Sequence, residues 1–284
     1  MHRNYISILF ILLSGILFSC NDTPQQNNSE ITAPAAGNIP PPAILQFNVL
    51  NVYPHDTLSY TQGFVIHDGQ LLEATGGNPS YNPAYKSGLG KVDLKTGKIS
   101  QKIPLDSSYF GEGITILKDK LYQLTWTSNK GFVYDAKSLK KLQEFPLKTE
   151  GWGITNDSSN LIMSDGSSNL YFLNPADFST LKVVGVNDNN GPVNNLNELE
   201  FINGYIYANK WQTNYILKID PSNGQVVGRA DLTGILERYS KEDITKDKYT
   251  SNDAVLNGIA YDGKTGKLFI TGKLWPSIYE VTLQ

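Results

Sequence analysis

Short apolar runs, each preceded by small or polar residues, recur along most of this chain. They are joined in pairs by turns that contain Asp, Asn or Gly. Two such runs around a short polar turn are typical of a β-hairpin. The 16 Tyr and 25 Gly also favour many short strands over long helices. The pattern therefore predicts an all-β protein.

The same hairpin pattern occurs five times. The passages are YTQGFVIHDGQLLEATG (60–76), FGEGITILKDKLYQLTW (110–126), EGWGITNDSSNLIMSDG (150–166), LNELEFINGYIYANKW (196–211) and LNGIAYDGKTGKLFITGK (256–273). Most of the gaps between them can hold two more strands. Units of roughly 40–50 residues with four strands are the sequence sign of a β-propeller. We expect a five-bladed β-propeller with four-stranded blades around a central channel.

The ends of the chain are expected to close this propeller. The fifth unit runs out at Gln284, and the stretch ILQFNVLNVY (44–53) can supply its missing outer strand, which would cover an open sheet edge. The charged segment 234–254 is expected to be an insertion with a short helix and a loop, not a sixth blade.

The first 43 residues differ from the rest. Residues 1–20 combine a weakly positive start, an apolar stretch and a terminal cysteine, as in a signal peptide. Cys20 at the cut resembles the lipobox of bacterial lipoproteins, although an ordinary signal peptide or an uncleaved anchor stays open. Residues 21–43 are polar and proline-rich, which predicts a flexible tether to the propeller domain at 44–284. We expect an exported protein, lipid-anchored to a bacterial membrane on its periplasmic or cell-surface side.

Charge and composition limit the partners. The net charge is −3 and no run of Lys and Arg offers a phosphate-binding face, so nucleic acid is not expected. No Gly-rich phosphate loop joins a strand to a helix, which argues against nucleotide chemistry. Cys20 is the only cysteine, so a lipidated chain has no disulfide. We expect no cofactor, no membrane contact except through Cys20, and a monomer.

Two positions of the repeated passage collect unusual residues. The head of the first strand holds Gln62, Glu112, Trp152, Asn197 and Asn257, and the end of the second holds Gly76, Trp126, Gly166, Trp211 and Lys273. In a propeller both positions face one mouth of the channel. Three of the four tryptophans occur here with amides, one carboxylate and one amine. Apolar walls with a few polar groups are typical of a ligand pocket.

These residues also have structural interpretations. A Trp on a strand is more often a core residue, although three that share two positions favour a pocket. Asn197 and Asn257 could cap blade turns, and Glu112 could pair with Lys273 as an ion bridge across the channel.

Other reactive side chains lie near or outside these positions. Glu198, Glu200 and Asp165 are nearby alternative acids, and strand alternation turns Glu198 away from the side that Asn197 faces. The three histidines are His2, His55 and His67. None occupies either position, so we expect neither a catalytic histidine nor a His-rich metal site.

Eight short motifs identify a family. YTQGF, FGEGIT, LTW, GWGIT with SDG, LNELE, NKW, LNGIAYD and TGKLWP occur in this order from about residue 45 to the C-terminus. They resemble the plant and bacterial glutaminyl-peptide cyclotransferases, the papaya-latex type of glutaminyl cyclase. The resemblance implies a five-bladed propeller that turns the N-terminal glutamine of peptides or proteins into pyroglutamate and releases ammonia. The animal enzyme with this activity is a zinc-dependent α/β protein and is not similar.

The resemblance also implies roles for residues. It makes Glu112 the acid/base group and brings Lys273 into the catalytic site. Its substrate-binding residues are Gln62, Phe110, Trp126, Trp152, Asn197 and Trp211, to which the repeat alignment adds Asn257. Two segments, 77–88 and 234–254, look longer than is usual in the family. They leave substrate preference open.

The chemistry fits these residues. The reaction is intramolecular, so the protein need only hold the folded-back substrate and move protons. We expect ionised Glu112 to accept the amine proton and deliver it to the departing nitrogen. Gln62, Asn197 or Lys273 could bond the amide and the oxyanion, while the tryptophans clamp the side chain and exclude water. Lys273 would lower the pKa of Glu112, and burial against tryptophan would raise it.

Two other functions remain open. A propeller glycosidase needs two carboxylates at a defined separation, and only Glu112 clearly lies in the two positions. A non-catalytic ligand-binding propeller on the cell surface would keep the tryptophans, but it would not need a lone acid and a lone amine.

Overall fold

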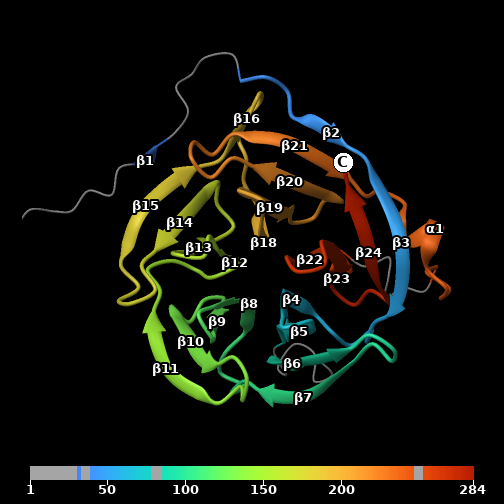
Figure 1. The fold of residues 1–284 in the computed structure, drawn as a ribbon, viewed down its shortest axis with the longest axis horizontal. Coiled ribbons are helices and arrows are strands. Elements are labelled where there is room, and N and C mark those ends of the chain that lie inside the picture. The colour runs from blue at the N-terminus through green and yellow to red at the C-terminus, as the bar shows by residue number, and fades with distance from the viewer. Residues whose placement is uncertain (1–30, 33–38, 78–84, 246–251) are drawn as a thin grey trace, which may run out of the picture.

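Five sheets surround a central axis in the computed structural model, which describes residues 31–32, 39–77, 85–245 and 252–284 (Figure 1). Within each sheet the consecutive strands pair antiparallel, and the first strand lies nearest the axis. The five repeated passages each supply the two inner strands of one blade. The predicted all-β, five-bladed propeller is therefore confirmed.

The blades follow the order of the sequence. Blade 1 consists of β4 (Thr61–His67), β5 (Gln70–Thr75), β6 (Gly88–Asp93) and β7 (Lys98–Pro104). Blade 2 consists of β8 (Gly111–Leu117), β9 (Lys120–Thr125), β10 (Lys130–Asp135) and β11 (Lys141–Pro146). Blade 3 consists of β12 (Ile154–Asn156), β13 (Leu161–Ser164), β14 (Asn169–Leu173) and β15 (Thr180–Gly185).

The last two blades include strands from the N-terminal region. Blade 4 consists of β18 (Leu196–Ile202), β19 (Tyr205–Lys210), β20 (Tyr215–Ile219), β21 (Val226–Asp231) and the added β2 (Ala43–Leu45). Blade 5 consists of β22 (Leu256–Asp262), β23 (Lys267–Gly272), β24 (Ser277–Leu283) and β3 (Phe47–Pro54). A small hairpin, β16 (Asn187–Asp188) with β17 (Gly191–Pro192), lies between blades 3 and 4.

Closure uses the expected strand and one more. β3 pairs antiparallel with β24, so blue β3 and red β24 lie side by side in Figure 1. The outer strand predicted from residues 44–53 is therefore confirmed. In addition, β2 runs parallel to β21 and ties the N-terminal chain to blade 4, which the sequence did not predict. A third strand, β1 (Ile31–Thr32), pairs in parallel with β15.

The hydrophobic core is divided into five clusters, and each lies between two neighbouring blades. For example, Leu72 of blade 1 packs with Ile114 and Phe132 of blade 2, and Leu256 of blade 5 packs with Ile216 of blade 4. Removing a buried aromatic such as Phe132 typically costs about 3–5 kcal/mol. This packing holds the inner strands in fixed positions around the axis.

The insertions and the N-terminal region are described only in part. Helix α1 (Ile235–Tyr239) occupies the start of the 234–254 segment, as expected, and residues 246–251 lie outside the described part. Of the 77–88 loop, residues 78–84 also lie outside it. The predicted signal peptide with Cys20 and most of the predicted tether fall there too. No helix within the described ranges is long and apolar enough to cross a membrane.

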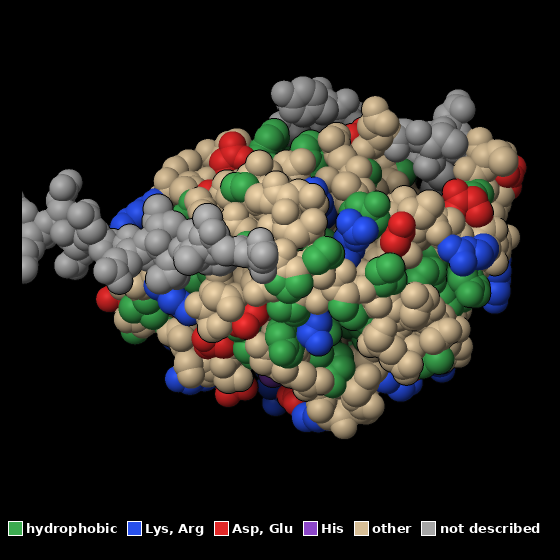
Figure 2. Space-filling view, turned by 90° about the horizontal axis from the view of Figure 1, so that it is seen from above, with side chains coloured by type: hydrophobic (Ala, Val, Ile, Leu, Met, Phe, Trp, Pro, Cys, Tyr) green, Lys and Arg blue, Asp and Glu red, His purple; other side chains and the backbone are tan. Residues whose placement is uncertain are grey.

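The outer surface of the disc is mixed in character. Figure 2 views the disc edge-on, on the side of β2 and β21, and shows Lys, Arg, Asp and Glu side chains scattered among hydrophobic ones. Neither sign of charge forms an extended patch on the part of this face that is described. The candidate site residues predicted from the repeats lie instead at the ends of the inner strands, near the axis.

Candidate active site

β-bulges position the polar residues at the heads of the inner strands. The pairing of the first two strands shifts register between Thr61 and Gly63, and again between Gly111 and Ile114. Equivalent shifts occur at Leu196/Leu199 and Leu256/Ile259. The bulges therefore contain Gln62, Glu112, Asn197 and Asn257. A bulge frees a residue from the ladder and can redirect its side chain, which explains how four blades present a polar group at the same place.

The glycines beside these residues allow neighbouring blades to touch. A Cβ on Gly113 would lie 2.8 Å from the backbone oxygen of Trp152, and one on Gly63 would lie 2.5 Å from the backbone nitrogen of Ile114. Any side chain would push these strands apart. Glu112 is followed by a glycine because its strand must pack tightly against the segment that begins the next inner strand.

A hydrogen-bonded chain joins Glu112 to two amides. Gln62 donates from Nε2 to Oε1 of Glu112 over 3.3 Å. Asn257 donates from Nδ2 to Oε1 of Gln62 over 3.4 Å and to the backbone oxygen of Thr61 over 2.9 Å. All three side chains are at most 5 % exposed. Blades 5, 1 and 2 thus hold the Glu112 carboxyl in one orientation.

The environment shifts the pKa values of Glu112 and Lys273 toward each other. Burial raises the pKa of Glu112 well above its usual value, although the charge of Lys273 opposes the shift. Burial likewise lowers the pKa of Lys273 to about 8, against the charges of Glu112 and Asp253. Of the two opposing effects that the sequence predicts for Glu112, burial is the stronger. The two groups form no direct ion pair within hydrogen-bonding reach.

Lys273 follows the end of β23 and lies against an aromatic ring. Its Nζ is 4.7 Å from the ring centre of Tyr60, which stabilises the ammonium form. Its backbone nitrogen donates to the oxygen of Val255 over 2.8 Å, which anchors the residue beside the head of blade 5. The side chain is 3 % exposed. The structure therefore provides a buried amine within electrostatic range of Glu112.

Aromatic side chains form an arc next to these groups. Phe110 meets Trp126 edge-on, with ring centres 5.8 Å apart, and Tyr60 meets Phe110 at 6.2 Å. Trp152 and Trp211 form a second edge-on pair at 5.5 Å. The rings come from the heads of blades 1 to 4, at the same end of the inner strands as Glu112. A wall of rings beside a buried acid and amine can hold an aliphatic chain with polar ends.

Comparisons with known proteins identify the family. The model of the glutamine cyclotransferase family matches residues 20–283. The chain is similar to the glutaminyl-peptide cyclotransferase of Arabidopsis thaliana, with 39% identity over 246 residues that cover 85% of this chain and 72% of the plant protein. Its fold is similar to the crystal structure of Myxococcus xanthus glutaminyl cyclase, with a TM-score of 0.74, 34% identity, and coverage of 86% and 98% of the two chains.

The chain belongs to the glutamine cyclotransferase family. The resemblance inferred from the eight motifs is confirmed, and with it the enzyme class, glutaminyl-peptide cyclotransferase. The roles of individual residues in this cyclotransferase stay predictions. The hydrogen bonds and burial of these residues limit which roles they can have.

Asn197 lies apart from the other polar groups. It is 2 % exposed, and its backbone oxygen accepts a hydrogen bond from Oγ of Ser164 over 2.7 Å. Its side-chain Oδ1 is buried, and no group in the described part of the chain donates to it. A Cβ on Gly153 would meet the Asn197 backbone, which places Asn197 beside the Trp152 segment. Oδ1 of Asn257 is likewise buried without a donor in the described part of the chain, so the cyclotransferase keeps two buried acceptors at these positions.

Sequence reasoning missed Glu150. This exposed residue accepts hydrogen bonds at Oε2 from the indole Nε1 of Trp126 over 2.9 Å and of Trp152 over 3.0 Å. It lies just before the repeated position that holds Trp152, so the repeat alignment did not select it. The one available signal was its place at the head of the EGWGIT passage, next to a predicted site residue.

The alternative acids have structural partners. Glu198 is fully buried and accepts hydrogen bonds from the backbone N–H groups of Phe64 and Ile259. Glu200 accepts from the backbone of Tyr261 and from Thr155, and burial raises its pKa to about 8. Burial, helped by the neighbouring charge of Glu200, also raises the pKa of Glu198 well above its usual value.

Asp165 is likewise engaged, because it accepts hydrogen bonds from Tyr171 and Ser167 of its own hairpin. Among the described residues, no group of three or more His, Cys, Asp and Glu side chains is arranged to hold a metal ion. Glu112 is therefore the acid that stands beside both the amine and the aromatic arc.

Proposed function

We propose that this protein cyclises the N-terminal glutamine of peptides or proteins to pyroglutamate and releases ammonia, by metal-independent general acid/base catalysis with Glu112. The observation that carries the proposal is the buried Glu112 carboxyl, oriented by Gln62 and coupled in charge to Lys273. Family membership supplies the reaction class, and this geometry supports Glu112 as the group that moves the protons.

The raised pKa of Glu112 suits the first proton transfer. A peptide α-ammonium has a pKa of about 7.7–8.0, so an ordinary carboxylate is far too weak a base to take its proton. Burial brings the Glu112 carboxyl closer to that range. Ionised Glu112 removes one proton from the ammonium, and the free amine then attacks the side-chain amide carbon.

The same carboxyl completes the reaction. As the new C–N bond forms, the amide oxygen becomes an oxyanion and the attacking nitrogen carries an excess proton. Protonated Glu112 donates to the departing amide nitrogen, which leaves as ammonia when the old C–N bond breaks. The resulting carboxylate takes the excess proton from the ring nitrogen. The proton left on Glu112 then passes to solvent or to ammonia.

The other polar groups position Glu112, stabilise the oxyanion and bind the substrate amide. Gln62 bonds directly to Glu112, and Asn257 holds Gln62 in turn, so these two amides position the acid. Lys273, with a pKa of about 8, retains a positive charge near neutral pH and stabilises the oxyanion. Asn197 Oδ1 accepts an N–H of the substrate amide, because it is a buried acceptor without a described donor.

The aromatic arc holds the substrate side chain. Phe110 and Trp126 on one side, and Trp152 and Trp211 on the other, contact its methylene groups and keep the folded-back conformer. Restricting the substrate to this conformer lowers the entropic part of the barrier. Exclusion of water strengthens the interactions with Glu112 and Lys273.

The direct test measures ammonia release from a glutaminyl dipeptide, with and without a metal chelator, by the wild-type protein and by Glu112→Gln. We expect chelator-insensitive release, and a loss of about 10²–10⁴-fold in Glu112→Gln with an unchanged circular dichroism spectrum. A folded Glu112→Gln protein with full activity contradicts the assignment. No release by the folded wild type favours the alternative, a non-catalytic ligand-binding propeller.

We also propose that the protein is exported and lipidated at Cys20, which anchors the propeller to a bacterial membrane through residues 21–43. The proposal rests on the signal-like residues 1–20 and their terminal cysteine. In a bacterial host the wild type should fractionate with membranes and incorporate labelled fatty acid. Cys20→Ser should lose the label, and a labelled Cys20→Ser protein contradicts this proposal.

A further inference from the structure

Glu150 links two tryptophans of different blades through one oxygen atom. Trp126 follows β9 of blade 2, and Trp152 precedes β12 of blade 3. Both indole N–H groups donate to Oε2, at 2.9 and 3.0 Å. Bonds from a neutral donor to a carboxylate are stronger than those between neutral groups. One side chain therefore fixes the relative orientation of two rings of the arc.

The other oxygen of Glu150 is the one that a ligand could use. Within the described part of the chain, no donor hydrogen-bonds to Oε1, and the residue is exposed. Its negative charge also acts on the candidate active site, because it contributes to the raised pKa of Glu112. The carboxylate is thus exposed to solvent, bonded to two indoles through one oxygen, and close enough to Glu112 to act on it through its charge.

Two charges of opposite sign act on Glu112. Glu150 and Lys273 both act electrostatically on Glu112, one as an anion and the other as a cation. The substrate of the proposed reaction carries charges that match these two groups. It enters with a positive α-ammonium, and its amide oxygen becomes negative during the attack. An ammonium is favoured by a carboxylate and by the faces of tryptophan rings, and Lys273 repels it.

We propose that Glu150 binds the α-ammonium group of the incoming peptide and, by holding Trp126 and Trp152, sets the orientation in which the amine faces Glu112. This inference rests on the proposed cyclisation of N-terminal glutamine. It makes Glu150 a substrate-binding and positioning residue that selects peptides with a free, charged N-terminus. The amide end of the glutamine then points to Lys273, which places the attacking nitrogen next to the proton acceptor.

Two substitutions separate charge from ring positioning. Glu150→Gln keeps an oxygen that can accept the indole N–H bonds but removes the negative charge. Glu150→Ala removes both. For Glu150→Gln we expect KM for a glutaminyl dipeptide to rise about tenfold while kcat changes less than about threefold, since uniform binding is lost. For Glu150→Ala we expect kcat to fall as well, because the indoles lose their shared acceptor.

The matched control is Glu144→Gln. Glu144 is an exposed glutamate on the outer strand of blade 2, where it pairs with Lys130 and Lys141. This substitution changes the net charge by the same amount, far from the aromatic arc, so KM should stay at the wild-type value. Equal KM values for Glu150→Gln and Glu144→Gln overturn the proposal.

A binding experiment tests the inference independently of turnover. In the Glu112→Gln background, calorimetry compares a glutaminyl dipeptide with its N-acetyl derivative, which carries no ammonium. We expect Glu150→Gln to weaken binding of the free-amine peptide about tenfold and to leave the acetylated peptide unaffected. Equal weakening of both peptides means that Glu150 only supports the rings, and it overturns recognition of the ammonium.

The two proposals can fail separately. If the wild type releases no ammonia but the free-amine peptide still binds through Glu150, the proposed reaction is wrong and the ammonium site stands. If ammonia is released and the calorimetric preference for the free amine does not depend on Glu150, the reaction stands and the ammonium site is wrong.

Discussion

Gln62 of blade 1 donates a hydrogen bond across the blade boundary to Oε1 of Glu112 in blade 2, over 3.3 Å. Each residue sits in a β-bulge at the head of its inner strand, so neither is tied to the strand ladder at this point. The bond connects the orientation of the acid to the spacing of two blades. It also favours the ionised form of Glu112, since the donor faces a carboxylate oxygen.

Gln62→Ala should lower kcat about tenfold and leave the fold intact, because Glu112 loses its orienting donor. The substitution should also raise the pKa of Glu112 further, which moves the acid limb of the kcat–pH profile to higher pH. Steady-state kinetics across pH measure both effects. Gln143→Ala, on the exposed strand β11, is the control and should match the wild type. An unchanged profile for Gln62→Ala means that the bond does not orient the catalytic acid.

Lys273→Met tests oxyanion stabilisation. Replacing the buried amine by a side chain of similar length should lower kcat about 10²–10³-fold, the usual cost of losing one such group. The loss should appear in kcat more than in KM, because the negative charge exists only in the transition state. Lys120→Met, a change at an exposed lysine of β9, should have no effect. If Lys273→Met changes only KM, Lys273 binds the ground state and our assignment is incorrect.

The pH dependence of kcat in the wild type follows from the pKa shifts of Glu112 and Lys273. Below the raised pKa of Glu112 the carboxyl is protonated and cannot accept the ammonium proton, so kcat falls as pH decreases. Above about pH 8 Lys273 loses its charge, so kcat falls again as pH increases. The profile should therefore be bell-shaped, with its acid limb well above the usual range of a glutamate. A flat profile between pH 5 and 7 contradicts a raised Glu112 pKa.

Much of this site was predictable because the blades repeat. The alignment of five hairpins selected Glu112, Gln62 and Asn257, which the structure joins through hydrogen bonds. It also selected Trp152 and Trp211, whose rings meet edge-on. Repetition reveals which residues share a position, and a closed propeller brings equal positions together. The number of blades followed from the same repeats.

Features outside the repeat were not predictable. Glu150 acts through a side chain that reaches two blades from a connecting segment, so nothing in the period of the sequence selects it. The parallel pairing of β2 with β21 depends on the three-dimensional path of the N-terminal chain. His55 was correctly placed outside the two site positions, but its buried partner Glu73 lies on another strand and was not anticipated.

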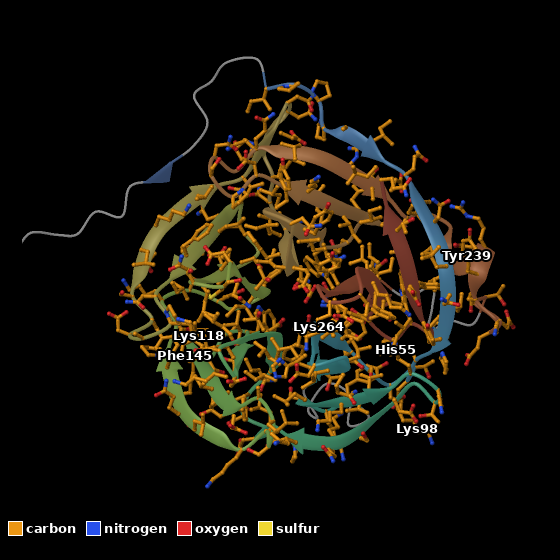
Figure 3. All side chains as sticks on the ribbon, in the orientation of Figure 1. His55, Lys98, Lys118, Phe145, Tyr239 and Lys264 are labelled. Carbon is orange, nitrogen blue, oxygen red and sulfur yellow. The ribbon has the colours of Figure 1, made fainter. Side chains whose placement is uncertain are left out.

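His55 links the closing strand to blades 1 and 5. It follows the end of β3, near the meeting point of these elements in Figure 3. Nδ1 lies 2.8 Å from the backbone oxygen of Trp275, and Nε2 lies 3.1 Å from Oε1 of Glu73. Both neighbours accept hydrogen bonds, so both ring nitrogens carry protons and the imidazole is positively charged. Burial alone would lower the pKa of His55, but Glu73 and the Trp275 carbonyl together raise it.

His55→Ala should therefore reduce the free energy of unfolding by about 3–5 kcal/mol, because the buried Glu73 carboxylate loses its cationic partner and keeps only the hydrogen bond from Thr61. A raised folded-state pKa means that the stabilisation is complete below the unfolded value of about 6.5, and is lost as pH rises through the folded-state value. The difference between wild type and His55→Ala, measured by denaturant unfolding, should thus shrink in alkaline buffer. The matched control is His67→Ala, since His67 is partly exposed and only 3.6 Å from the exposed Asp68. Equal stability of the two variants at about pH 6 would show that the buried pair does not hold the closure together.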